Sequence, residues 1–416
     1  MHTMHLRDLH GETLGICVSG GLDSRTVTRR LIEAGCKVVC FTADLGQPDE
    51  VDIEDVQRRM EATGAESHVV DLKPQMAEAC FATIKALAQY DGGYWNTTGI
   101  ARAVTVRGLV SAMQERGCTV LVHGATGRGN DQIRFERYTN VLAPQMKVYA
   151  PWRDPAMLAE FPGRKQMAQY LQAVGLEAKL ERKRYSTDAN LAGLSHEAED
   201  LESLATSCLI VDPIMCTWPQ HAPDAVEDVT LRFERGRCVA IDGDYLAPLP
   251  LMQKANAIGG RNGIGLANAL ENRIIGTKSR GVYEAPGMEL LGTGLRSIYQ
   301  AVLDRRSTSL FGHVSRLVAE ATYDGRLYDP APRAALGCVD VLAEHATGTV
   351  VLGLYRGNAF VQQIRDVPAS LYNPADASME ASDGLDPRSS QGFVEIQRCE
   401  ALALARAGQI RPPERF

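Results

Sequence analysis

The sequence predicts an α/β protein in which a parallel, doubly wound sheet forms an N-terminal domain, an α+β domain follows, and a helix lies near the end of the chain. Two observations support this prediction. Short β-rich runs alternate with longer segments of helical apolar spacing over roughly the first 170 residues. Such alternation implies right-handed crossovers and a parallel sheet covered on both faces. Beyond that point the alternation stops, and paired β-rich runs of hairpin type follow.

Five β-rich runs are expected to be the strands of the N-terminal sheet, at 13–18, 37–42, 67–71, 119–123 and 147–151. Helical spacing marks segments between them, for example 25–35 and 98–117. Ligands of such sheets bind at the carboxyl edge of the strands. The polar stretches SGGLDS, ADLGQ and HGATGRGNDQIRFE follow the first, second and fourth runs. We therefore expect the functional site at this edge.

The alternation breaks at a charged segment near residues 172–182, where we place a domain boundary. The expected domains are 1–176 and 177–375, followed by a tail at 376–416. In the second domain, antiparallel hairpins are predicted at 227–243 and 348–364, and one helix is predicted at 288–306. In the tail, residues 392–409 predict an apolar-faced helix that packs on another subunit.

Composition narrows the class of protein. The 416 residues carry a formal net charge of -7, with acidic and basic residues mixed throughout, which argues against a nucleic-acid partner. No apolar run reaches the roughly 18 residues that a membrane span needs, and the first residues lack the apolar core of a signal peptide. The 10 cysteines include no CxxC pair. We expect a cytoplasmic protein with reduced thiols and no structural zinc.

The stretch Ser19-Gly-Gly-Leu-Asp-Ser24 follows the first strand and opens a helix. Backbone N–H groups that converge at a helix N-terminus bind anions, and Gly20 and Gly21 supply the backbone freedom for such a turn. Two glycines alone would favour a plain strand-to-helix turn. The whole string at this place is more specific, so we interpret it as a phosphate loop, although it lacks the Lys and the longer spacing of a Walker loop. Asp23 is expected to position a metal ion or the loop itself.

The stretch GATGRGNDQIR (124–134) is the second candidate for ligand binding. Its three glycines let the backbone approach a ligand. Thr126 and Asn130 offer hydrogen bonds, and Asp131 with Arg134 can recognise an ammonium and a carboxylate, which suits a small charged amino acid. A helix cap at Asn130 or Asp131 is the alternative interpretation, and the two are compatible.

The phosphate-loop string resembles that of the N-type ATP pyrophosphatases, which cleave ATP between its α and β phosphates and use the AMP half to activate an oxygen as a leaving group. Further stretches resemble the argininosuccinate synthase family and occur in the same order. They are FTADLGQ (41–47), HGATGRGNDQIRFE (123–136), KVYAPWRD (147–154), YSTDANLAGLS (185–195), IGGRNGIG (258–265), ENRIIGTKSRGVYEAPG (271–287) and LYRGNAFV (354–361). The resemblance runs from about residue 13 to about residue 398.

This resemblance implies a ligase that condenses citrulline, or a related ureido compound, with aspartate through a citrullyl-AMP intermediate, giving argininosuccinate, AMP and pyrophosphate. It also implies ATP and Mg²⁺ as cofactors and a homotetramer as the assembly. ATP is expected at Cys17, Val18, Ser19, Gly20, Gly21, Leu22, Asp23, Ser24, Arg25, Ala43 and Gly124. Aspartate is expected at Thr126, Asn130 and Asp131, and citrulline at Tyr94, Asn130, Arg134, Ser186, Ser195, Glu271 and Tyr283.

We assign catalytic roles to Asp23 and Asp131. Asp131 would orient the aspartate amine and accept its proton, while the metal ligands stay open. Cys17 is expected to be a packed strand residue rather than a nucleophile. Glu271 is expected in a helix, where a Glu is usually solvated, but the string around it favours a substrate contact.

Several places depart from the family pattern, among them Leu266 and Asn268, which replace an Arg and an Asp usual just before the ENR stretch. Arg25 replaces a small hydroxyl residue and either strengthens pyrophosphate binding or points to solvent. Gly99 replaces a serine that contacts citrulline, which removes a hydroxyl donor or makes room for a bulkier substrate. The stretch after Ser195 also differs. Two alternatives therefore stay open: a specialised paralogue that joins aspartate to a different ureido or amide acceptor, and a binding or regulatory homologue without catalysis.

Overall fold

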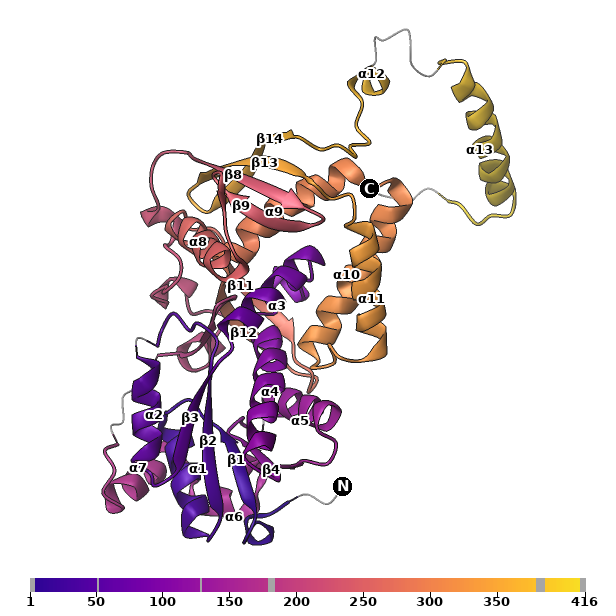
Figure 1. The fold of residues 1–416 in the computed structure, drawn as a ribbon. Helices are drawn as coiled ribbons and strands as arrows, with labels where there is room; N and C mark the ends of the chain where they lie inside the picture. The colour runs from indigo at the N-terminus through magenta and orange to yellow at the C-terminus, as the bar shows by residue number, and fades with distance from the viewer. Residues whose placement is uncertain (1–3, 51, 128, 179–183, 379–385, 412–416) are drawn as a thin grey trace. The chain divides into compact units, whose positions relative to one another are not determined.

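The computed structural model describes residues 4–50, 52–127, 129–178, 184–378 and 386–411. The chain divides into two compact units, residues 1–369 and residues 370–416, and each is described by itself. Figure 1 shows the elements of both units, coloured along the chain. No helix in the described ranges has the length and apolar character that crossing a membrane requires.

A five-stranded parallel sheet with the order β3-β2-β1-β4-β5 lies in the N-terminal part of the first unit. Its strands are β1 Thr13–Cys17, β2 Lys37–Asp44, β3 Glu66–Asp71, β4 Val120–His123 and β5 Lys147–Tyr149. The five predicted strands and their parallel arrangement are confirmed. Since β1 is the central strand, the loop that follows it starts from the middle of the sheet.

Helices cover both faces of this sheet (Figure 1). The residues of β1 alternate in direction, and on one side Leu14 and Ile16 share an apolar cluster with α1 and α7. On the other side Phe41 shares a second cluster with α3 and α4. The helices are α1 Leu22–Glu33, α2 Ile53–Glu61, α3 Lys73–Lys85, α4 Thr97–Glu115, α5 Asp131–Leu142, α6 Pro155–Glu160 and α7 Arg164–Ala173. The fold class, a doubly wound α/β domain, is thereby confirmed.

A second, antiparallel sheet has the order β11-β12-β7-β6. Its strands are β6 Ser186–Asn190, β7 Gly193–Glu197, β11 Leu266–Asn272 and β12 Lys278–Glu284. The prediction that Glu271 lies in a helix is wrong, because β11 pairs with β12 along its whole length, from Leu266 to Asn272. The strand is defined by its hairpin partner β12, which lies outside the stretch around Glu271. A short run of mixed apolar and polar residues does not by itself indicate a strand.

A third sheet has the order β10-β9-β8-β13-β14 and contains both predicted hairpins. Its strands are β8 Glu227–Glu234, β9 Arg237–Ile241, β10 Asp244–Tyr245, β13 Gly348–Tyr355 and β14 Asn358–Arg365. The helices of this region are α8 Pro248–Arg261, α9 Pro286–Val302, α10 Arg305–Tyr323 and α11 Pro330–Leu342. Short 3₁₀ helices occur along the unit at Leu6–Asp8, Asp91–Gly93, Pro151–Arg153, Glu199–Glu202, Cys208–Ile210 and Pro219–His221.

The single helix predicted at 288–306 is in fact two helices. α9 ends at Val302, and the carboxylate of Asp304 accepts hydrogen bonds from the backbone N–H groups of Arg306 and Ser307 at the start of α10. An aspartate in this position is a strong N-terminal cap. The helical spacing continues across 288–306 in the sequence, so this cap was not recognised there.

The second unit contains α12 (Pro374–Ala377) and α13 (Ser389–Arg406). The predicted tail helix is confirmed as a helix. Its apolar side chains Phe393, Val394 and Ile396 are all more than 60% exposed within the described chain, at 66%, 61% and 68%.

A buried carboxylate fastens the second sheet to the loop before β8. Glu284, fully buried in β12, accepts hydrogen bonds from the backbone N–H groups of Ile214, Met215 and Cys216. His196, also fully buried, lies with its Nε2 at 2.6 Å from Glu284 Oε1. One side chain therefore satisfies several buried donors behind the strands that carry Ser195 and Tyr283.

We expect Glu284→Gln to lower the free energy of unfolding by about 3 kcal/mol. The amide nitrogen of the glutamine would face backbone N–H donors, and these buried donors would lose the negative charge that now accepts their hydrogen bonds. Denaturant unfolding monitored by tryptophan fluorescence measures this loss. Glu234→Gln, at the exposed end of β8, is the matched control and should change stability by less than about 0.5 kcal/mol. Equal stabilities for both variants would contradict the assignment.

Candidate active site

The phosphate-loop candidate lies between the end of β1 at Cys17 and the start of α1 at Leu22. Gly20 has φ 71°, in the left-handed region, and a Cβ there would lie 2.9 Å from Val56 Cγ1. The Ser19 backbone N–H donates to Ser24 Oγ at 3.2 Å, and the two serine hydroxyl oxygens lie 3.4 Å apart. The sequence therefore folds here into a turn that requires glycine and gathers backbone donors and hydroxyls at a helix N-terminus.

Charged side chains surround this loop. Arg59 donates from Nη1 to the Gly20 carbonyl at 3.2 Å. Burial raises the pKa of Asp23, and the charge of Arg164 opposes that rise. Arg25 donates from Nη1 to the Glu177 carbonyl at 2.7 Å and is only half-buried. Arg25 is thus anchored to the segment after α7, which neither of the two predicted roles described.

The strands next to β1 bring two further ATP candidates to the same edge. Cys17 is paired with Phe41 of β2 on one side and with His123 of β4 on the other. Ala43 and Gly124 therefore follow at the level of the loop. A Cβ on Gly124 would meet nothing within 4 Å, so the space beside it is open. Burial raises the pKa of Cys17 to about 12, which agrees with a packed thiol rather than a nucleophile.

α5 begins at Asp131, within the second candidate stretch. Asn130 occupies the N-cap position, but its side chain does not cap the helix. Instead its Oδ1 accepts from the Ile274 N–H at 3.1 Å, and its Nδ2 donates to the Tyr323 hydroxyl at 2.9 Å. Thr126 lies in the exposed loop before it. The alternative interpretation as a cap is therefore correct for the position of Asn130 and wrong for its side chain.

Asp131 is at the centre of a partly buried ion-pair network. Its Oδ2 accepts from Arg102 Nε and its Oδ1 from Arg134 Nη1, both at 2.9 Å, and Arg102 Nη2 donates onward to Asp188 Oδ2 at 2.7 Å. Burial raises the pKa of Asp131, but the charges and hydrogen bonds of the two arginines outweigh it and hold that pKa below its usual value. This carboxylate is therefore a weak base that is well placed to orient a ligand, and the geometry argues against the proton-accepting part of its predicted role.

Several residues expected to bind citrulline lie on one face of the second sheet. Tyr283 pairs directly with Ser195, Glu271 with Ser279, and Ser186 with Glu197. Side chains alternate along a strand, and the hydrogen bond from the Tyr283 hydroxyl to Glu271 Oε1, at 2.9 Å, joins the neighbouring strands across this face. The fully buried Tyr94 ring lies 4.2 Å from the Tyr283 ring. Residues far apart in sequence thus lie together on this face.

Glu271 has an oxygen without a protein partner. Its Oε1 accepts from Tyr283 and Ser279, whereas its Oε2 is buried and has no hydrogen-bond partner among the described residues. Burial raises the pKa of this carboxyl, and the Tyr283 hydrogen bond opposes the rise. A buried carboxylate oxygen of this kind calls for a donor, and a ligand ammonium would supply one.

Sequence reasoning missed Glu197, which lies in the divergent stretch after Ser195. Its Oε1 accepts from the Ser195 hydroxyl at 3.2 Å. Burial, with the negative charges of Glu271 and Asp188, raises its pKa to about 7. Arg102 and Asp188 were missed as well, although Asp188 lies inside the string at 185–195 that resembles the family. The signal was there, but only the fold shows that these side chains meet.

Packing between two helices explains why residue 99 is a glycine. A Cβ at this position of α4 would lie 2.9 Å from the Thr322 carbonyl oxygen of α10. The close approach of the two helices therefore requires glycine, which explains the departure without any change of substrate.

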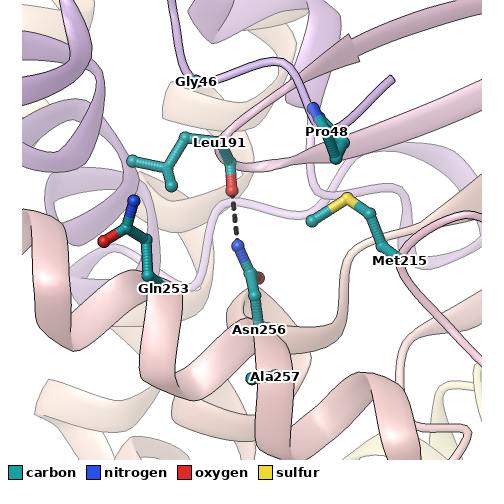
Figure 2. A pocket seen from close by; sticks show the side chains of 7 residues that line it. All are labelled: Gly46, Pro48, Leu191, Met215, Gln253, Asn256 and Ala257. Atoms are coloured by element: carbon teal, nitrogen blue, oxygen red, sulfur yellow. Dashed lines mark hydrogen bonds between the residues drawn. The ribbon is translucent and has the colours of Figure 1, made fainter. Parts of the chain in front are cut away.

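A pocket of about 290 Å³ lies beside the loop after β2 (Figure 2). Asn256 of α8 donates from Nδ2 to the Leu191 carbonyl at 2.8 Å and holds the β6–β7 turn against the helix. The pocket is lined by Gly46, Pro48, Leu191, Met215, Gln253, Asn256 and Ala257, none of which is a predicted site residue. Within the described ranges, no group of three or more His, Cys, Asp or Glu side chains could hold a metal ion.

The parallel sheet, with its glycine turn at the carboxyl end of β1, has the architecture of a doubly wound nucleotide-binding fold. Comparison with protein-family models agrees: residues 14–177 match the arginosuccinate synthase N-terminal HUP domain, and residues 185–403 match the arginosuccinate synthase C-terminal domain. The second match alone covers more than half of the chain. The chain belongs to the argininosuccinate synthase family and is an ATP-dependent ligase of that family, of the kind that joins carbon to nitrogen.

The raised pKa of Glu197 predicts a pH dependence of stability. Between the usual Glu value and about pH 7, the folded chain keeps a proton that the unfolded chain has released, so stability falls as pH rises through this window. Glu197→Gln removes this effect. We expect its Tm to exceed that of the wild type at pH 8 and the difference to shrink toward pH 5, as measured by differential scanning fluorimetry. Glu199→Gln, at an exposed site nearby, is the control. A difference independent of pH would contradict the shift.

Proposed function

We propose that this chain condenses citrulline with aspartate, with cleavage of ATP to AMP and pyrophosphate, to form argininosuccinate. The observation that carries the proposal is the position of Arg134. It is hydrogen-bonded to Asp131 of the aspartate set, and its charge acts on Glu271 and Tyr94 of the citrulline set. One buried guanidinium thus links the residues expected to hold the two amino acids.

The chemistry explains why ATP is needed. The carbon of a ureido group is a poor electrophile, and its oxygen is a poor leaving group. Attack of that oxygen on the α-phosphate gives citrullyl-AMP and releases pyrophosphate. The neutral amine of aspartate then attacks the activated carbon, and AMP departs. Alignment of two bound reactants supplies roughly 7–11 kcal/mol of barrier reduction, so the reaction requires no protein nucleophile.

The chain's own residues bind and orient the reactants in this proposal. The turn from Ser19 to Ser24 holds the phosphates, and Asp131 orients the amine of aspartate. The free Oε2 of Glu271 accepts the citrulline ammonium, whose positive charge would favour the ionised form of the neighbouring Glu197. Binding and alignment, rather than proton transfer by Asp131, are the contribution of these groups.

Mg²⁺ fits this site as a companion of the nucleotide. It usually keeps several waters and needs one or two protein carboxylates together with phosphate oxygens. Asp23 and the Ser24 hydroxyl, both in the first turn of α1, are the groups that would hold it. When bound, the ion would neutralise negative charge on the phosphates.

The reaction is tested by incubating the protein with ATP, Mg²⁺, aspartate and citrulline and following AMP and pyrophosphate. Both products should appear in equal amounts and only when both amino acids are present. Formation of ADP, or no AMP with any of a panel of ureido compounds, would contradict the proposal. AMP formed only with another ureido compound would identify a different acceptor.

We also propose that the chain functions as a homotetramer in the cytoplasm. The exposed apolar side chains of α13, among them Phe393 and Ile396, support an assembly in which another copy covers this helix. Light scattering should give four times the 45.3 kDa chain mass. A monomeric mass at micromolar concentration would contradict this proposal.

A further inference from the structure

Tyr323 is a buried residue for which neither the sequence nor the proposed reaction gives a role. It is the last residue of α10, and 1% of its surface is exposed. It lies about 190 residues after the start of α5, yet it contacts two residues of that helix start. Both residues, Asn130 and Arg134, belong to the candidate amino-acid site.

Three different parts of Tyr323 make these contacts. Its hydroxyl accepts from Asn130 Nδ2 at 2.9 Å, and its backbone carbonyl accepts from Arg134 Nε at 2.8 Å. The guanidinium carbon of Arg134 lies over its ring, 4.9 Å from the centroid. Tyr90 stacks on the same ring at 3.9 Å with an interplanar angle of 15°, and the Tyr90 hydroxyl donates to the Asn272 carbonyl of β11. The ring is therefore fixed from the side of the second sheet.

The backbone after Tyr323 approaches α5 closely. Gly325 has φ 73°, and a Cβ on it would lie 3.0 Å from Arg134 Cα. Only glycine permits this approach without strain. The turn between α10 and α11 thus packs directly against the residue that links the two amino-acid sets.

The hydroxyl of Tyr323 decides how the Asn130 amide lies. Asn130 Oδ1 accepts from the Ile274 N–H, and Nδ2 donates to Tyr323. An amide can be turned over at little cost unless both of its ends have partners. Burial raises the pKa of the Tyr323 hydroxyl, so it stays a neutral acceptor at physiological pH. Because both the oxygen and the nitrogen of the amide are hydrogen-bonded, the Asn130 side chain has one defined orientation.

We propose that Tyr323 is a positioning residue that fixes Asn130 and Arg134 for the two amino-acid substrates without itself touching the reacting atoms. This inference rests on the proposed function, because it assigns Asn130 and Arg134 to aspartate and citrulline. Through Tyr323, the helical pair α10–α11 becomes part of the binding site although no residue of the pair was predicted to contact a substrate.

Tyr323→Phe tests the hydroxyl alone, since the ring, the stacking and the carbonyl remain. We expect the KM for aspartate and for citrulline to rise about five- to tenfold, as for the loss of one buried hydrogen bond, while the KM for ATP changes less than twofold. Tyr328→Phe is the matched control. Its hydroxyl, in the same inter-helix turn, donates to the Ala103 carbonyl of α4, away from Asn130. The control should leave all three KM values unchanged.

A double-mutant cycle shows whether Tyr323 acts through Asn130. If it does, Tyr323→Phe should add less than twofold to the KM of Asn130→Ala. Independent, multiplicative effects would overturn the inference, and so would equal rises for ATP and the amino acids, which indicate a structural role only.

A readout without catalysis separates this inference from the proposed function. The side-chain amide signal of Asn130, assigned in ¹⁵N-asparagine-labelled protein by its loss in Asn130→Ala, should shift in Tyr323→Phe and stay in place in Tyr328→Phe. An unmoved signal in Tyr323→Phe would overturn the inference even in an active enzyme. If the wild type forms no AMP, the proposed function fails, and the amide signal still decides whether Tyr323 holds Asn130.

Discussion

Replacing Asp131 by asparagine is expected to reduce kcat/KM for aspartate at least about 10³-fold. The side chain keeps its shape but loses its charge, and Arg102 and Arg134 then face each other across a neutral amide. In the proposed reaction this carboxylate also holds the aspartate amine, and losing one partner of such a hydrogen-bonded charge pair costs about 4 kcal/mol of binding, which corresponds to about a 10³-fold loss of kcat/KM when it is lost in the transition state. Steady-state formation of AMP measures the effect.

Asp329→Asn is the control for this variant. Asp329 forms a two-oxygen ion pair with Arg137, further along the same helix α5, at 2.8 and 2.6 Å. Its loss should lower stability without a comparable loss of turnover. Asp131 would have no part in the reaction if Asp131→Asn retained more than a tenth of the wild-type kcat/KM.

Gly20→Ala is expected to raise the KM for ATP about 100-fold and to lower stability by about 1–2 kcal/mol. The new Cβ would be forced into left-handed backbone and toward Val56 Cγ1, which belongs to a buried side chain of α2 and cannot move away freely. A shift of about 1 Å in the backbone donors is enough to cost about 10²-fold in rate. Initial rates of pyrophosphate release at varied ATP measure the change.

Gly35→Ala separates backbone strain from damage to the loop. Gly35 follows the other end of α1 and also has positive φ, 81°, and a Cβ there would lie 3.2 Å from the His10 ring. We expect a similar loss of stability and a normal KM for ATP. Equal KM values for the two variants would mean that the turn at Gly20 does not bind the nucleotide.

The parallel sheet could be predicted from the sequence because each strand carries its own signal, a short β-rich run between helical segments. The phosphate-loop candidate could be located for a related reason. Ser19 to Ser24 are contiguous, and their position between a strand and a helix follows from the local pattern. Features of this kind depend on neighbours in the chain, so one sequence is sufficient to find them.

The network around Asp131 could not be predicted in the same way. Arg102 comes from α4, Asp131 from α5 and Asp188 from β6, and no local pattern shows that three such side chains meet. The same holds for Glu271, whose strand is defined by its pairing with β12, and for Gly99, whose reason lies in the Thr322 carbonyl of another helix. Residue contacts across elements require the fold.

The most direct test of the central claim, activation of a ureido oxygen by adenylation, uses citrulline labelled with ¹⁸O in the ureido group. The label should appear in AMP after turnover with aspartate and ATP, because the ureido oxygen bonds to the α-phosphorus and leaves with it. Mass spectrometry of the AMP phosphate detects the transfer. AMP without ¹⁸O, or label in pyrophosphate, would contradict the proposed reaction.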